Sequence, residues 1–172
     1  MISYTLLEFD ELPSTSDLLK ENKSYFPHLT IVRADYQTKG RGQFDRSWES
    51  DKKANILCSI LLKQLTKDAL NQVKPWVLTA LVDTMQHYGI MPTFKEPNDL
   101  YVDKAKIAGI LIESISHEEI FESVIIGIGL NVNQENFSAP HATSFMKIKK
   151  QVFDVAEVFT LLIQSLLKTY PF

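Results

Sequence analysis

The sequence predicts an α+β domain in which a mixed, largely antiparallel sheet is backed by helices. Segments with strand-like and helix-like hydrophobic spacing interleave along the chain. Several consecutive strand segments are too close together to be joined by the crossover helices that parallel strands need. With 172 residues the chain is long enough to bury one core, so we expect residues 1–172 to form a single domain.

The first half of the chain alternates short strands with two helices. We expect a strand at Tyr4–Phe9, a break at Leu12-Pro13, a helix at Ser14–Asn22 and a strand at Leu29–Tyr36. Residues 37–53 then form a polar loop. The run Ile56–Leu62 is almost continuously apolar, which is typical of a strand buried on both faces.

The second half begins with a long helix at Ala69–Tyr88, whose apolar residues follow the 3.6-residue helical period. Gly89 stands where a glycine usually ends a helix. We then expect strands near Thr93–Lys95, Lys106–Ser116 and Phe121–Asn133, with a short hairpin at Asp103-Lys104, and a last helix at about Val155–Tyr170.

Composition excludes several function classes. The formal net charge is −3, and a dedicated nucleic-acid binder normally carries a basic excess. The single cysteine, Cys58, excludes an internal disulfide and a cysteine-rich zinc site. No apolar stretch reaches the roughly 18 residues of a membrane span, and the first residues do not resemble a secretory signal. We therefore expect a cytoplasmic protein that binds neither nucleic acid nor membrane.

Missing motifs narrow the chemistry further. The chain has no G-x-x-x-x-G-K-[ST] motif, so any use of ATP would not be of the P-loop kind. It has no G-x-S-x-G nucleophile elbow, and its four histidines lack metal-ligand spacing. Metal-dependent and triad hydrolases are therefore disfavoured.

The segment QTKGRGQFDRSW at residues 37–48 is the strongest local signal. Gly40 and Gly42 allow backbone N–H groups to form an anion-binding nest, and Arg41 and Arg46 offer planar cations that match phosphate or carboxylate. Trp48 offers a flat apolar surface for a ring. The same composition also fits a solvated surface loop anchored by a buried tryptophan.

A second segment, KEPNDL, is followed by KIAGIL. Asn98 and Asp99 could contact a polar ligand or Mg²⁺, or form a plain turn. Lys106 opens an apolar strand, so its ammonium projects either toward a ligand or out to water. A third segment, GIGLNVN at residues 127–133, reads as a strand with space for a ligand on its glycine face, or as a tightly packed core strand.

Taken together and in this order, these segments resemble the catalytic domain of biotin protein ligases. The resemblance spans about residues 7 to 133, and the family signature is G-R-G-R-x-G-R-x-W, K-W-P-N-D and K-x-x-G-[IL]-L. It implies a fold like the class II synthetases and a two-step reaction. Biotin is activated with ATP and Mg²⁺ to biotinyl-5′-AMP, and the biotinyl group then passes to a lysine on the biotin-carrier domain of a carboxylase.

The resemblance also implies roles for individual residues. Lys106 and Arg41 would be catalytic, with Lys106 between the biotin carboxylate and the α-phosphate. The residues implied to bind biotin are Ser14, Thr15, Gln37, Gly40, Arg41, Trp48, Lys106 and Gly109. The residues implied to bind ATP or the adenylate are Gly42, Arg46, Trp48, Lys95, Asn98 and Asn131, with Asp99 as a metal ligand. A homodimer is one assembly that the resemblance allows.

Three positions depart from the signature. Gln43 replaces an arginine, Asp45 a glycine and Glu96 a tryptophan. A helix-turn-helix before the catalytic region is not expected, and the residues after Asn133 are too few for the small C-terminal β-barrel that many members carry. Two alternatives therefore stay open: a weakened relative that holds biotin or biotinyl-AMP, and a lipoate or octanoyl transferase of related fold.

Overall fold

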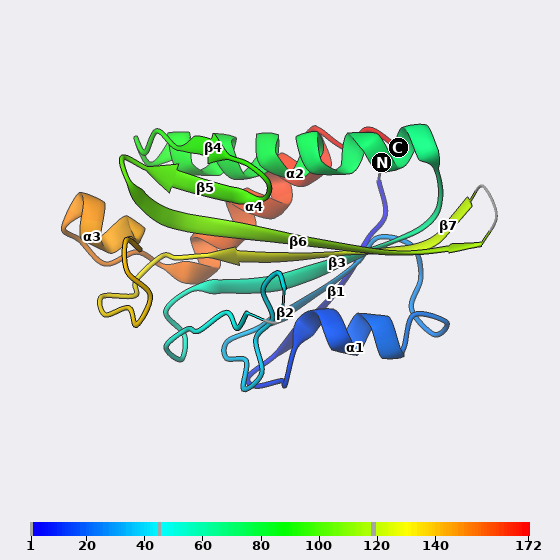
Figure 1. Cartoon of the computed structure of the whole chain (residues 1–172), viewed down its shortest axis with the longest axis horizontal. Helices are drawn as coiled ribbons and strands as arrows, with labels where there is room; N and C mark the ends of the chain where they lie inside the picture. Colours follow the sequence, from blue (N-terminus) through cyan, green and yellow to red (C-terminus); the bar gives the residue numbers. More distant parts are fainter. Residues whose placement is uncertain (1, 45, 118–119) are drawn as a thin grey trace.

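The computed structural model describes residues 2–44, 46–117 and 120–172, which form one sheet with helices on both faces (Figure 1). Its elements are β1 (Thr5–Phe9), α1 (Thr15–Glu21), β2 (Thr30–Ala34), β3 (Ile56–Thr66), α2 (Lys67–His87), β4 (Thr93–Lys95), β5 (Asp99–Val102), β6 (Ala105–His117), β7 (Ile120–Leu130), α3 (Phe145–Lys149) and α4 (Val155–Lys168).

The seven strands lie in the order β1-β2-β3-β7-β6-β5-β4. Strands β1 and β2 run parallel, and every other neighbouring pair is antiparallel. The prediction of a mixed, largely antiparallel sheet is therefore confirmed. Strands β4, β5, β6 and β7 pair in chain order as antiparallel neighbours, whereas α1 lies between β1 and β2, as a parallel pair requires.

One face of the sheet carries the main core. Figure 1 shows α2 and α4 side by side over this face. Alternate residues of β3, β6 and β7, such as Ile60, Ile110 and Ile126, are buried beneath them. The indole N–H of Trp76 on α2 donates to the carbonyl of Leu166 on α4 at 2.9 Å, which joins the two helices.

The opposite face is covered only in part, by α1, which lies on the other side of the sheet in Figure 1. Leu19 packs there on Val32, Leu61 and Ile125 in a small second core. Ser14 caps the helix by accepting a hydrogen bond from Asp17 N–H at 3.2 Å. Beyond α1 this face carries Ser59 and the glycines 109, 127 and 129 between larger side chains such as Leu57 and Leu111, and the space that the small residues leave forms a cavity.

Hydrophobic periodicity located most elements to within a few residues, but two short ones were missed. Strand β5 and helix α3 have four and five residues, too few to show a period. The predicted buried strand Ile56–Leu62 is confirmed, although β3 continues to Thr66. Gly89 adopts the expected left-handed conformation after α2, with φ of +66°.

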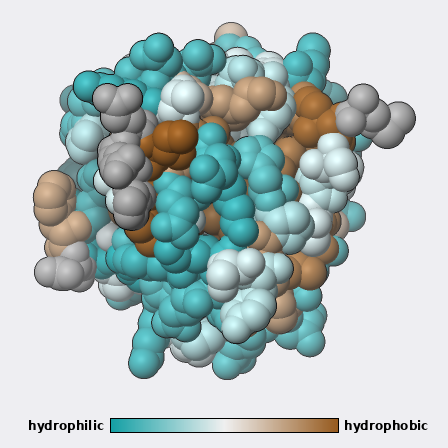
Figure 2. Space-filling view, turned by 90° about the vertical axis from the view of Figure 1, so that its right-hand side faces the viewer, coloured by the Kyte–Doolittle hydropathy of each residue, from teal (hydrophilic) through white to brown (hydrophobic). Residues whose placement is uncertain are grey.

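Two further features bear on function. No helix in the described parts of the chain has the length and hydropathy needed to cross a bilayer. Cys58 is buried in the main core, and burial raises the pKa of its thiol to about 12, so it is a packing residue and not a nucleophile. Figure 2 shows one end of the molecule, where hydrophilic side chains predominate and apolar ones appear in separate groups.

Candidate functional site

A cavity of about 300 Å³ lies beside the N-terminus of α1, on the incompletely covered face of the sheet. Its walls come from α1, β3, β6, β7 and the loop that precedes β3. The residues predicted to form the site that line it are Ser14, Thr15, Gln37, Arg41, Gly42, Arg46, Trp48, Asp99, Lys106 and Gly109. The fold thus brings together residues that lie up to 95 positions apart in the chain.

Residues 40–44 and 46–48 form two short arms beside this cavity, and we call these two arms the ribbon loop. Trp48 N–H donates to the carbonyl of Gly40 at 2.9 Å, and Gly42 N–H donates to the carbonyl of Arg46 at 2.7 Å. The expected anion nest is therefore wrong at Gly42, because its N–H is used within the loop. The glycines serve a different purpose: a Cβ at Gly40 would collide with the backbone of Trp48.

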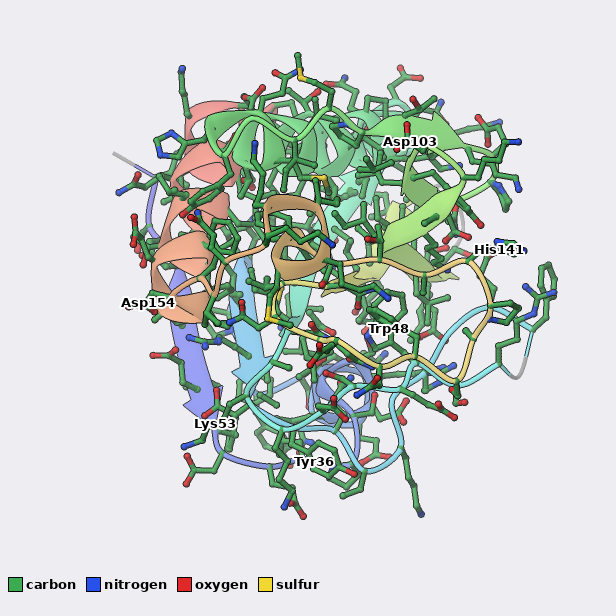
Figure 3. All side chains as sticks on the ribbon, turned by 90° about the vertical axis from the view of Figure 1, so that its left-hand side faces the viewer. Tyr36, Trp48, Lys53, Asp103, His141 and Asp154 are labelled. Carbon is green, nitrogen blue, oxygen red and sulfur yellow. The ribbon has the colours of Figure 1, made fainter. Side chains whose placement is uncertain are left out.

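Trp48 lies flat on the glycines of two neighbouring strands. Gly109 on β6 and Gly129 on β7 are paired in register, and a Cβ on either would meet the indole ring. Figure 3 shows Trp48 toward the middle of the molecule, between the loop after β2 and the segment after β7. The glycines on this face thus provide the space into which the Trp48 ring packs, whereas the sequence pattern predicted space there for a ligand.

Lys106 stands at the same wall as Trp48. Its Nζ is 2.8 Å from Asp99 Oδ1 and 5.4 Å from the centre of the Trp48 ring. The ammonium therefore faces the cavity and not the surrounding water. Its side chain is about one-third exposed, so an anion that enters the cavity can reach it.

A chain of hydrogen bonds crosses the inner end of the cavity. Thr15 N–H donates to Gln37 Oε1 at 2.8 Å, which fixes the amide because a backbone N–H can only donate. Thr15 Oγ1 donates to the same oxygen at 3.0 Å, so its hydroxyl proton is used there.

The hydroxyl groups of Ser59 and Ser16 must then donate their hydrogen bonds in one direction, toward Thr15. Ser59 Oγ lies 2.7 Å from Thr15 Oγ1 and donates to it, and Ser16 Oγ lies 2.8 Å from Ser59 Oγ and donates in turn. The chain runs from Ser16 through Ser59 and Thr15 to Gln37. It leaves hydroxyl lone pairs and the Gln37 NH₂ group available, so this end of the cavity offers both acceptors and donors.

Arg41 points away from Lys106, toward α1. Its Nη1 and Nη2 donate to the two carboxylate oxygens of Glu113 at 2.9 Å each, and Nη1 also donates to Asp17 Oδ1 at 2.7 Å. The hydrogen bond that Arg41 donates to Glu113 is the main cause that raises the pKa of Arg41. Burial alone would raise the pKa of Glu113, but hydrogen bonds from Arg41 and Lys20 outweigh it and lower that pKa. Arg41 and Glu113 are therefore both ionised at neutral pH.

A second cavity of about 520 Å³ continues from the first past Arg46, Trp48 and Lys106. One of its walls is the segment after β7, which contributes Asn131, Gln134 and Phe137 among others. Asn131 Nδ2 donates to the carbonyl of Thr143 at 3.1 Å, which leaves Oδ1 as a buried acceptor without a partner in the described residues. This acceptor suits a ligand that carries an amine.

Three predicted site residues lie outside both cavity walls. Lys95 is on the edge strand β4, with Nζ 4.8 Å from the centre of the Tyr101 ring. Asn98 is buried in the β4–β5 turn, where its carbonyl accepts from Ile110 N–H at 2.9 Å. Gly40 lies behind Gln37, and its missing Cβ leaves room for the Gln37 amide.

The residues that depart from the family signature do not form one group. Gln43 lines the first cavity. Glu96 is exposed, and its carboxylate lies 3.9 Å from Lys74 on α2, outside the walls of both cavities. Asp45 lies outside the described residues.

Sequence reasoning missed several residues of the site. Ser16 and Ser59 complete the hydroxyl chain, and Gly127 makes room for Ser16 because a Cβ there would lie 2.9 Å from Ser16 Oγ. One signal was present: Ser59 is a hydroxyl inside an otherwise apolar strand. The partners of Arg41 gave no such signal, because Glu113 is 72 residues away.

The described residues contain no cluster of three or more metal-ligating His, Cys, Asp or Glu side chains. Asp99 is the carboxylate nearest the predicted reaction centre, and it is already paired with Lys106. Mg²⁺ is commonly held by one or two carboxylates together with substrate phosphates. The donors present therefore fit an Mg²⁺ ion that enters with a triphosphate.

Comparisons with known proteins agree with this arrangement. The sequence model of the biotin/lipoate A/B protein ligase family matches residues 6–131. The bifunctional ligase/repressor BirA of Bacillus spizizenii is 35% identical over 153 residues, which cover 84% of this chain and 46% of that protein. The biotin–[acetyl-CoA-carboxylase] ligase of Mycobacterium tuberculosis is 30% identical over 127 residues, covering 69% and 45%. The chain thus spans about half the length of the curated relatives it matches.

Among solved structures, the biotin protein ligase of Aquifex aeolicus in complex with biotin and ATP is similar over 96% of this chain and 69% of that chain. The TM-score is 0.76 and the identity is 28%. The fold class is therefore confirmed by an independent structure.

Proposed function

The chain belongs to the biotin/lipoate A/B protein ligase family, and we propose that it activates biotin with ATP and transfers the biotinyl group to a protein lysine. In the first step a carboxylate oxygen of biotin attacks the α-phosphorus of ATP, and the bond to pyrophosphate breaks. In the second step a lysine amine attacks the acyl carbon, loses a proton, and AMP leaves. The acceptor we propose is the biotin-carrier domain of a carboxylase.

The hydroxyl chain at the inner end of the cavity is the observation that carries this proposal. The ureido ring of biotin has one carbonyl that accepts and two N–H groups that donate. The Gln37 NH₂ group can donate to the carbonyl, and lone pairs of the Thr15, Ser16 and Ser59 hydroxyls can accept from the N–H groups. The dithiolane ring of lipoate has no such groups and would leave these polar atoms unpaired, which is costly in a buried site.

The other end of the cavity suits the reacting carboxylate. A bound anion there meets the Lys106 ammonium and the Arg46 side chain, which also lines the second cavity. Holding a carboxylate against a triphosphate calls for placed cations more than for an acid–base pair. Mg²⁺ would supply further neutralisation of the phosphates when ATP is bound, with Asp99 as the nearest protein ligand.

The second cavity is where we place the nucleotide. It adjoins Lys106, so a phosphate chain can begin at the reaction centre and the base can lie farther along. Asn131 Oδ1 is then available to accept from the exocyclic amine of adenine. Phe137, which lines the same cavity, offers an apolar ring face.

Biotin-dependent exchange of labelled pyrophosphate into ATP tests the proposal. We expect exchange with biotin and Mg²⁺ and none above background with lipoate. Absence of exchange at saturating biotin and ATP would contradict the enzymatic activity, and faster exchange with lipoate would contradict the assignment of the ring pocket.

We expect Thr15→Val to weaken biotin binding by about tenfold, because it removes a hydroxyl in the middle of the hydrogen-bond chain with almost no change in shape. Calorimetric titration with biotin measures the change. Thr79→Val, at an exposed position on α2, is the matched control and should bind as the unaltered chain does. Equal affinity of the Thr15 variant and the control would show that the chain does not recognise the ring.

One observation favours a second candidate, a relative that holds biotin or biotinyl-AMP without efficient transfer. Gln43 lines the cavity where the family signature has arginine, so this wall lacks one cation beside an anionic ligand. Tight binding of biotin without labelling of a carrier domain would support this candidate over the ligase.

A further inference from the structure

The ribbon loop is fixed to the sheet at two places on strand β6. Trp48 packs on Gly109, and Arg41 binds Glu113, four residues farther along the same strand. Side chains of a strand alternate between its faces, so Gly109, Leu111 and Glu113 share one face and the two fixed points lie roughly 13 Å apart. Leu111, between them, lines the cavity. The loop therefore crosses the cavity and is held on either side of it.

The Arg41 contact joins three separate segments of the chain. The guanidinium comes from the ribbon loop, Asp17 from α1 and Glu113 from β6, with donor–acceptor distances of 2.7 to 2.9 Å. The pair with Glu113 is bidentate, the geometry in which an arginine–carboxylate contact is strongest. The backbone hydrogen bonds of Gly42 with Arg46 and of Trp48 with Gly40 are made within the loop itself. The side chains of Arg41 and Trp48 are thus its main links to the sheet.

The charges in this cluster balance. Lys20 on α1 donates to Glu113 Oε1 at 3.2 Å, so two cations face two carboxylates. The Glu113 side chain is only 21% exposed, which reduces the screening that weakens surface ion pairs. Arg41 already has its hydrogen bonds directed at protein carboxylates. An anionic ligand in the cavity meets Lys106 without displacing these bonds.

We propose that Glu113, with Asp17, is a positioning residue that holds the ribbon loop closed over the ligand by binding Arg41. Glu113 does not touch the ligand on this view. It acts on retention of the ligand through Arg41 and the loop. The part of this proposal that concerns retention of biotin and its adenylate rests on the proposed function. The part that concerns the position of the loop does not.

Limited trypsin digestion without any ligand tests directly whether Glu113 keeps the ribbon loop in place. Lys39 precedes the loop and Arg46 lies within it, and both are exposed, so cleavage after them reports how often the loop opens. We expect Glu113→Gln to accelerate cleavage at these two sites by about tenfold, because the ion pairs of Glu113 with Arg41 and Lys20 are both lost. Glu122→Gln is the matched control: Glu122 on β7 pairs with Lys23 at 3.1 Å and has no contact with the loop. Equal cleavage rates in the Glu113 variant and the control would overturn the proposal.

Exchanging the charges at positions 41 and 113 distinguishes loss of the ion pair that holds the loop from a general loss of packing. The double variant Arg41→Glu with Glu113→Arg places an arginine between two carboxylates again, Asp17 and the new one. We expect cleavage after Lys39 and Arg46 to return to within about threefold of the unaltered chain, whereas Arg41→Glu alone is cleaved rapidly. Failure of the exchange to restore protection, with both single variants folded by circular dichroism, would also overturn the proposal.

Kinetics then connect the loop to the reaction. In Glu113→Gln we expect biotinyl-AMP to dissociate about tenfold faster, with its rate of formation at saturating substrates changed by less than about twofold. A chain that binds no biotin would refute the proposed function and leave the digestion result standing. A tenfold loss in the rate of formation with unchanged dissociation would refute the positioning role of Glu113.

Discussion

Lys106→Ala is expected to lower the rate of biotinyl-AMP formation by about 10²- to 10³-fold, the usual effect of removing one placed charge from a reaction centre. Lys106 Nζ faces the cavity from β6 and is held there by Asp99 at 2.8 Å. No other cation of β6 or β7 can replace it, because residues 107–146 contain no lysine or arginine. Pre-steady-state formation of the adenylate, followed with labelled ATP, measures the loss.

Lys104→Ala is the matched control for this variant. Lys104 lies two residues away in the exposed β5–β6 turn, so its removal changes net charge equally without touching the cavity. We expect its rate to stay within about twofold of the unaltered chain. Similar losses in both variants would show that the effect is one of overall charge. Near-normal formation in Lys106→Ala would refute the role of its ammonium.

The fold was predictable where a pattern is local. The helical period at α2 and the apolar run at Ile56–Leu62 each signal one element without help from the rest of the chain. The parallel pairing of β1 with β2 is different. It depends on α1 crossing one face of the sheet, and no residue within β1 or β2 signals it. Element types thus follow from local sequence, and strand neighbours follow from the whole fold.

The same distinction applies to the site. The family resemblance of the motifs implied that Trp48, Lys106 and Gly109 share one site, and the structure brings the three together. It could not predict on which side of a strand a charged residue acts. Glu96 turns outward to Lys74, although it stands inside a motif. Glu113 belongs to no motif considered from the sequence, and the register of β6 brings it under Arg41.

Gly129→Ala is expected to weaken biotin binding by about ten- to a hundredfold, the cost of overpacking a fitted contact. A Cβ at position 129 would lie 2.6 Å from Cζ2 and 2.8 Å from Cδ2 of Trp48, well inside van der Waals contact. Strand β7 is central and paired on both sides, so it cannot retreat. The indole must move instead, and the ribbon loop opens with it. Calorimetric titration with biotin measures the loss of affinity.

A double-mutant cycle identifies the cause of that loss. In Trp48→Leu the smaller side chain leaves space above Gly129, so adding Gly129→Ala to this variant should change affinity by less than about twofold. If the two losses simply add, the alanine acts through the strand and not through the ring. Unfolding in urea provides the complementary test: because Trp48 belongs to a loop and to neither hydrophobic core cluster, we expect Gly129→Ala to reduce the free energy of unfolding far less than the free energy of biotin binding. The glycine at 129 would then be required by the position of the indole and not by the sheet.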